Sequence, residues 1–232
     1  MVQVYVPAGD FEMGAVDDDP DADDDEKPRH TVYLDAFWID QTEVTNAQYA
    51  QCVADGACER PGSNESWTRD SYYGNAQFDN YPVIWVSWHN ALAYCQWAER
   101  RLPTEAQWEK AAGGTDGRKW PWGNQRPDNT LVNFNRNVGD TTPVGNYPAG
   151  ASPYGAYDMA GNVWEWVFDE YGSNYYASSP SDNPVGPSSA KTKILRGGPW
   201  YHSAPYIRVR DRVQNFAINR DQLRGFRCAS SP

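Results

Sequence analysis

The stretch of this sequence that says most about its fold is Asp158-Met159-Ala160-Gly161-Asn162-Val163-Trp164-Glu165-Trp166. Two polar side chains, Asn162 and Glu165, stand next to large aromatic ones, so they can turn inward and hold neighbouring backbone through hydrogen bonds. The tryptophans fit a hydrophobic core, because an aromatic ring buries a large apolar area. The stretch therefore predicts a loop-rich fold that buried polar groups hold together.

A second stretch predicts the start of a helix: Arg101-Leu102-Pro103-Thr104-Glu105-Ala106-Gln107-Trp108-Glu109. Thr104 and Gln107 are three residues apart, which is the spacing of a capping box. Glu105 and Glu109 lie one helical turn apart, and Trp108 between them can face the core. The two stretches together indicate a framework that supports loops.

Outside these stretches, the pattern of apolar residues and the helix-capping residues predict a mixed α+β chain. Residues 2–14 are expected to form a strand and a turn, because Val2, Val4 and Val6 alternate before Pro7-Ala8-Gly9, and a second alternating run over residues 30–39 indicates another strand. Capping residues and glycines place helices over residues 45–56, 87–100 and 104–114. We therefore expect two or three helices in the N-terminal half.

The rest of the chain has little helical signal. Residues 59–82 are polar and aromatic without a period, so we expect a long loop there. From Trp120 onward, glycine, asparagine, proline and aromatic residues alternate, which predicts short strands held by turns and long loops. Because no repeat and no linker-like tract is visible, we expect a single domain over residues 1–232.

The composition argues against several classes of protein. The formal net charge is −11, which repels nucleic acid and anionic membrane surfaces. No apolar run approaches the roughly 18 residues of a membrane span. The N-terminus has no recognisable signal peptide, so a cytoplasmic location is expected if the chain is complete. A piece cut from a longer protein is the alternative, and the compartment stays open.

Residues 17–26 carry much of the negative charge, with eight acidic residues among ten. Like charges at this density repel one another, which favours a solvated surface loop. A calcium-binding loop is the alternative.

The four cysteines are Cys52, Cys58, Cys95 and Cys228. Four cysteines allow three connectivities, and their spacing is not that of a zinc site. Cys52 falls near a helix end and Cys58 just past Gly56, so we expect a short bridge between them. Cys95 would then tie the second helix to Cys228 near the C-terminus. Buried free thiols are the alternative.

Eight groups of residues, in order from residue 6 to residue 228, resemble the formylglycine-generating-enzyme family. Besides the two stretches above, they are Val6-Pro7-Ala8-Gly9 with Met13-Gly14, Thr42-Glu43-Val44-Thr45-Asn46, Pro82-Val83-Ile84-Trp85-Val86-Ser87-Trp88, Pro121-Trp122-Gly123-Asn124, Arg196-Gly197-Gly198, and Gly225-Phe226-Arg227-Cys228. The resemblance implies an α+β, C-type-lectin-like fold with short strands, two or three helices and long loops.

The resemblance does not extend to the catalytic residues. The family's enzymes oxidise a substrate cysteine with copper, which two cysteines shortly after the Arg-Gly-Gly motif hold. Residues 199–208 contain no cysteine here, and Cu(I) needs soft thiolate ligands that His202 cannot replace. A related subfamily uses a multi-histidine iron site, but His30, His89 and His202 form no such pattern. We therefore expect no copper, no catalytic residue and no oxidase activity.

The resemblance does imply calcium as a structural ion. The matching positions are Asp158 and Glu165, through side-chain oxygens, and Gly161 and Val163, through carbonyl oxygens. Oxygen-only ligation suits Ca²⁺, and Asp158 replaces a family asparagine while keeping an oxygen ligand. A loop held by hydrogen bonds alone is the alternative. A second family site, with different spacing, would match three positions: Asn133, Phe134 and Asp140.

Residues 199–224, the C-terminal segment, have an unusual composition. Between the Arg-Gly-Gly and Gly-Phe-Arg motifs, fourteen residues with neither helical nor strand periodicity are all encodable from an Asn codon by changing its two adenines. Lys, Glu, Met and Trp cannot be encoded in this way, and they are absent from residues 201–223. This resembles the variable region of proteins diversified by diversity-generating retroelements, which use C-type-lectin-like folds. An ordinary binding loop or a vestigial active-site loop is the alternative.

We therefore expect a monomeric ligand-binding module whose partner is another protein. The alternative is a catalytically inactive sensor or regulatory domain attached to a kinase or protease. Aromatic anchors give large contact areas at low entropic cost. The expected contact residues are Tyr201, His202, Ser203, Tyr206, Ile207, Asp211, Val213, Asn215, Phe216, Ile218, Asn219, Asp221 and Leu223.

Overall fold

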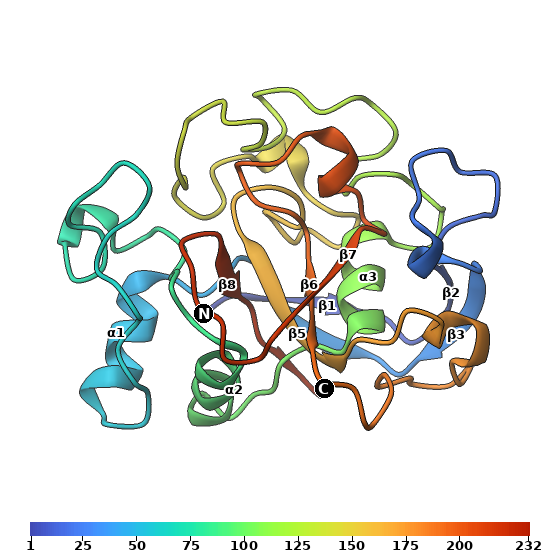
Figure 1. Cartoon of the computed structure of the whole chain (residues 1–232), viewed down its shortest axis with the longest axis horizontal. Helices are drawn as coiled ribbons and strands as arrows, with labels where there is room; N and C mark the ends of the chain where they lie inside the picture. Colours follow the sequence, from blue (N-terminus) through green and yellow to red (C-terminus); the bar gives the residue numbers. More distant parts are fainter.

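The computed structural model describes residues 1–232 and has a mixed α+β fold (Figure 1). The helices are α1 (Asn46–Ala54), α2 (Trp88–Trp97) and α3 (Glu105–Gly113). The strands are β1 (Gln3–Val6), β2 (Gly9–Met13), β3 (His30–Leu34), β4 (Phe37–Asp40), β5 (Trp164–Glu170), β6 (Lys193–Arg196), β7 (Arg212–Asn215), β8 (Arg224–Phe226) and β9 (Ala229–Ser230). Five short 3-10 helices, η1 to η5, complete the elements. None of the helices has the length and apolarity needed to cross a bilayer.

All three α-helices begin at the expected capping residues. Thr45, Ser87 and Thr104 each accept a hydrogen bond from a backbone N–H three residues later. The second helix ends at Trp97 and not near Arg100, because Glu99 adopts a left-handed conformation with φ of 57°. Local capping chemistry therefore fixes where these helices begin.

The strands form three small sheets. Their orders are β1-β4-β9, β2-β3 and β7-β6-β5-β8, and every pairing is antiparallel except that of β5 with β8. Strand β1 ends before the expected turn at Pro7, and β2 follows that turn in a different sheet. The single run expected over residues 30–39 is two strands, β3 and β4, also in different sheets. Helix α3 contacts strands of two sheets (Figure 1), which places its Trp108 in the core.

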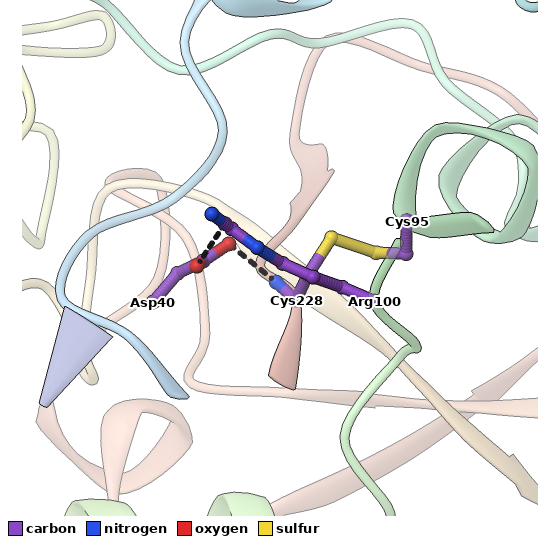
Figure 2. The surroundings of a disulfide bond; sticks show 4 residues. All are labelled: Asp40, Cys95, Arg100 and Cys228. Atoms are coloured by element: carbon purple, nitrogen blue, oxygen red, sulfur yellow. Dashed lines mark hydrogen bonds and ion pairs between the residues drawn. A yellow bond between two sulfur atoms is a disulfide. The ribbon is translucent and has the colours of Figure 1, made fainter. Parts of the chain in front are cut away.

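The C-terminus closes the structure. Strand β9 pairs with β4, and Cys228 just before it forms a disulfide with Cys95 of α2, with a Cα–Cα distance of 5.7 Å. Beside this bond, Asp40 accepts hydrogen bonds from Arg100 at 2.6 Å and from the Cys228 backbone N–H at 2.9 Å (Figure 2). The second expected disulfide, Cys52–Cys58, is also present.

Candidate binding surface

A pair of glycines holds the start of the C-terminal segment close to the core. Gly197 and Gly198 have φ values of +90° and +68°, which favour glycine. A Cβ atom on Gly198 would lie 2.1 Å from the backbone oxygen of Tyr206. The backbone after β6 therefore packs directly against the 3-10 helix η5 (Ala204–Ile207), which lies near the upper edge of Figure 1.

Three arginines at the start of and within this segment, Arg196, Arg208 and Arg212, are paired with acidic side chains in the interior. Arg196, at the end of β6, lies against Glu105 and Glu109, and Arg212 donates two hydrogen bonds to Glu105 at 2.8 and 2.9 Å. Arg208 donates two to Glu26 at 2.7 and 2.6 Å. Breaking a buried pair of this kind leaves an uncompensated charge, so the arginines hold the backbone in place.

Most of the expected contact residues reach the surface. Tyr206, Phe216 and Ile218 are 50%, 56% and 73% exposed. Ser203 is also exposed. The other expected contact residues that reach the surface are partly buried: Tyr201, His202, Val213, Asn215, Asn219, Asp221 and Leu223.

Two of the thirteen expected contact residues require a correction. Ile207 is fully buried in a small cluster with Trp120 and Leu131, because η5 turns it inward. Asp211 is only 2% exposed and lies near Arg208. Neither side chain can contact a protein ligand in this conformation.

An exposed aromatic patch surrounds Tyr201. Its ring lies 6.1 Å from the ring of Trp67 and 5.7 Å from that of Trp200, and the Arg136 guanidinium lies 3.8 Å above it. Trp67 is 56% exposed, although it comes from a loop that the sequence analysis left without a role. An exposed tryptophan in an irregular polar loop is the signal that would have identified it.

His202 connects this patch to the rest of the segment. Its ring lies 5.7 Å from that of Trp164 and 5.3 Å from that of Tyr206, and burial lowers the pKa of His202. The backbone N–H of Trp164 donates to the Leu223 carbonyl at 2.7 Å. The two ends of the segment are thus joined through Trp164.

The loop between β7 and β8 presents Phe216 and Ile218 on a rigid backbone. The backbone N–H of Trp88 donates to the Ala217 carbonyl oxygen at 3.1 Å, and the backbone N–H of Trp85 donates to the Asp221 carbonyl oxygen at 2.9 Å. Ile218 borders a cleft of about 350 Å³ between this loop and α2. The framework therefore satisfies the backbone of the loop and leaves its apolar side chains free.

Three buried carboxylates gather at the first expected calcium site. Glu165 accepts from Trp108 at 2.8 Å and twice from Arg227 at 2.7 Å. Asp158 accepts from the Gly145 N–H at 2.6 Å, whereas Oε2 of the nearby Glu43 has no partner. Burial raises the pKa of Glu43 and of Asp158. One guanidinium among three carboxylates leaves an excess of negative charge, which favours a cation. The oxygens of the three carboxylates do not all lie within 4.8 Å of one another, so calcium at this site stays a prediction.

The backbone at this site also has free acceptors. No backbone N–H donates to the carbonyl oxygen of Gly161 or Val163. Both carbonyl oxygens are therefore free to accept from another group, and calcium at Asp158, Gly161, Val163 and Glu165 stays the prediction that the resemblance gave. Glu43, which the sequence analysis did not place there, adds a third carboxylate.

The residues expected for a second calcium site are mostly partnered within the fold. Asp140 Oδ2 accepts hydrogen bonds from the hydroxyls of Ser66 and Thr68, and Arg69 lies 3.3 Å from Oδ1. Asn133 donates to the Asp140 carbonyl oxygen at 2.9 Å, whereas its own Oδ1 is buried without a partner. Arg69 already supplies one positive charge there, and calcium at Asn133, Phe134 and Asp140 stays a prediction.

The comparisons with known proteins agree with the fold. The protein-family model of the sulfatase-modifying factor enzyme 1-like domain matches residues 2–232 of this sequence. The formylglycine-generating enzyme of Streptomyces coelicolor is 35% identical, over 98% of this chain and 88% of its own length. The serine/threonine-protein kinase pkn1 of Chlamydia caviae is 34% identical, over 97% of this chain but 37% of its own length. The structure of Treponema denticola variable protein 1 superposes with a TM-score of 0.79 at 27% identity, over 99% of this chain and 95% of its own.

Proposed function

This chain belongs to the formylglycine-generating-enzyme family of sulfatase-modifying factor 1-like domains, and we propose that it is a ligand-binding module. In this proposal the C-type-lectin-like scaffold displays the C-terminal segment as a surface diversified by a retroelement. The observation that carries the proposal is the division within this segment. Arg208 and Arg212 are paired with acidic side chains inside the fold, while Tyr206, Phe216 and Ile218 are at least half exposed.

The chemistry of the surface favours a protein as the ligand. Exposed tyrosine, phenylalanine, isoleucine and half-exposed histidine side chains resemble the anchors that dominate protein interfaces. They are spread over η5 and the β7–β8 loop, which is a broad surface and not one deep pocket. The likeness to a variable protein of Treponema denticola supports the same assignment.

The same proposal makes the chain inactive as an oxidase. Residues 199–208 offer Tyr201, His202 and Tyr206 where the family's enzymes hold copper with two cysteines. All four cysteines of this chain are in disulfides elsewhere. Nothing in the segment offers the thiolates that Cu(I) requires.

A second function, that of an inactive sensor or regulatory domain, has one observation in its favour. A serine/threonine-protein kinase of Chlamydia caviae contains a similar domain in 37% of its length. In that case the surface would recognise one fixed partner, and its residues would not vary.

Sequencing the 3′ end of the gene from sister isolates separates the two functions. We expect substitutions to concentrate at exposed positions such as 206, 216 and 218, with only small apolar-to-apolar changes at the buried Ile207. Arg196, Gly197 and Gly198 should stay constant. An invariant segment would overturn the diversified-surface proposal.

A stability measurement tests whether the surface is free to vary. Replacing Tyr201, His202, Tyr206, Phe216 and Ile218 together by Ser should lower the unfolding free energy by only a few kcal/mol, because exposed changes usually cost about 0.5 kcal/mol or less each. The matched control is the single buried change Ile207→Ser, for which we expect a loss of about 3 kcal/mol or more. Unfolding or aggregation of the five-site variant would show that these side chains belong to the core.

A further inference from the structure

The acidic N-terminal segment meets the C-terminal segment at a second group of carboxylates. Asp23 and Glu26 precede β3, and Asp211 precedes β7, so they are distant in sequence. Carboxylate oxygens of all three lie within 4.8 Å of one another. Glu26 and Asp211 are buried and Asp23 is exposed, so the group is open to solvent on one side.

The charges in this group do not balance. Arg208 donates hydrogen bonds to both oxygens of Glu26, and its Nη2 lies 3.7 Å from Oδ1 of Asp211. One guanidinium therefore faces three carboxylates, which leaves two negative charges when all are ionised. Burial makes such an excess costly unless another positive charge compensates it.

One buried oxygen has no partner. Oδ2 of Asp211 makes no hydrogen bond, although the side chain is only 2% exposed. Nearly all buried polar atoms in proteins are partnered. The adjacent Asp25 shows the usual arrangement, because its carboxylate accepts from the Tyr171 hydroxyl at 2.7 Å. The missing partner is therefore a property of Asp211 and not of the acidic segment in general.

We propose that Asp23, Glu26 and Asp211 bind a divalent metal cation, with Oδ2 of Asp211 as its innermost ligand. A dipositive ion offsets the two excess charges and gives Oδ2 a partner. Three carboxylates and an opening to solvent suit Ca²⁺, which takes six to eight oxygens in flexible geometry, better than Mg²⁺, which demands a near-ideal octahedron. The site is separate from that at Asp158 and does not depend on the proposed binding function.

In this proposal the acidic residues between positions 17 and 26 have a structural role, because two of them bind the cation. The cation would fasten this segment to the base of the C-terminal segment, next to the Arg208–Glu26 pair. A proton on Asp211 is the competing way to remove its charge, because burial raises the pKa of Asp211 to about 7. A bound cation and a proton on Asp211 are distinguished by whether the site binds calcium.

Isothermal titration of CaCl₂ into the full chain at pH 7.5, after removal of metal with a chelator, tests the proposal. We expect Asp211→Asn to bind one calcium ion fewer than wild type, and Asp23→Asn to bind at this site at least tenfold more weakly. Asp24→Asn is the matched control, because it removes the same charge from the same segment but lies outside the group. It should bind as wild type does.

Asp158→Asn distinguishes this site from the family site, since it should remove a different ion. Thermal melting in chelator checks that Asp211→Asn is folded, which we expect because the change removes an uncompensated buried charge. Wild type that binds no calcium, or Asp211→Asn that binds as many ions as wild type, would overturn the proposal. Loss of all binding in Asp158→Asn would do so as well.

Discussion

Asp169 in β5 shows how a single buried carboxyl group in this fold avoids carrying a charge. Its carboxylate accepts one hydrogen bond, from the Glu105 N–H at 2.8 Å, and is 2% exposed. Burial, followed by the charge of Glu105, raises the pKa of Asp169 to about 8. The folded chain therefore keeps a proton on Asp169 that the unfolded chain releases near pH 4.

This pKa shift predicts a pH dependence of stability. Because the folded state binds the extra proton, the unfolding free energy falls as pH rises from about 4 to about 8, by up to about 1.4 kcal/mol per pH unit. Asp169→Asn still accepts the Glu105 N–H but cannot ionise, so its gain in melting temperature over wild type should be larger at pH 8 than at pH 5. The exposed Asp70→Asn is the control, and an equal gain at both pH values for Asp169→Asn would contradict the prediction.

A second prediction at this scale concerns the cysteines that the C-terminal segment lacks. The purified chain should not oxidise a cysteine-containing sulfatase peptide in the presence of copper, because residues 199–208 hold no thiolate. The Streptomyces coelicolor enzyme provides the positive control under the same conditions. Turnover above the no-enzyme rate would contradict the inactive assignment.

At the scale of elements, the two disulfides should differ in importance. Cys95–Cys228 spans 133 positions and Cys52–Cys58 spans 6. In the chain-entropy model the longer loop contributes about 5 kcal/mol and the shorter about 2 kcal/mol. Denaturant unfolding of the Cys95→Ala/Cys228→Ala and Cys52→Ala/Cys58→Ala variants should show the larger loss for the first pair. Equal losses would mean that strain or unfolded-state structure outweighs loop entropy.

The elements also show which features the sequence could predict. Capping pairs such as Thr45 with Gln48 are local, so they placed the helix starts correctly. The separation of β3 from β4 was missed because residues 30–39 form one alternating run, and only pairing partners distinguish the two strands.

The interior and the site depend on contacts that local patterns do not encode. Glu26 and Arg208 are 182 positions apart, and Trp67 reaches Tyr201 from a loop without periodicity. Ile207 and Asp211 were expected at the surface because codon composition is blind to burial. A list of diversifiable positions is therefore not a list of exposed ones.

At the scale of the whole molecule, bound calcium should raise stability through both proposed sites. A ligand that binds only the folded state adds RT ln(1 + [L]/Kd), about 2.7 kcal/mol at one hundred times Kd. Wild type should melt at a lower temperature in chelator than in calcium. Asp158→Asn and Asp211→Asn should each lose part of that difference, and the double variant all of it. A double variant that still responds to calcium as wild type does would place the ion elsewhere.

The position of β8, Cys228 and β9 has a consequence for how the protein is made. These elements are translated after residues 199–224, yet they complete two sheets and one disulfide. A stop codon or frameshift within that segment would leave the edges of β4 and β5 unpaired on the sides that these strands cover, and Cys95 without its partner. Molecules that complete the fold must therefore have been read in frame through residues 199–224. The fold therefore excludes chains in which a stop codon or frameshift alters this segment, while it accepts chains in which only side chains differ.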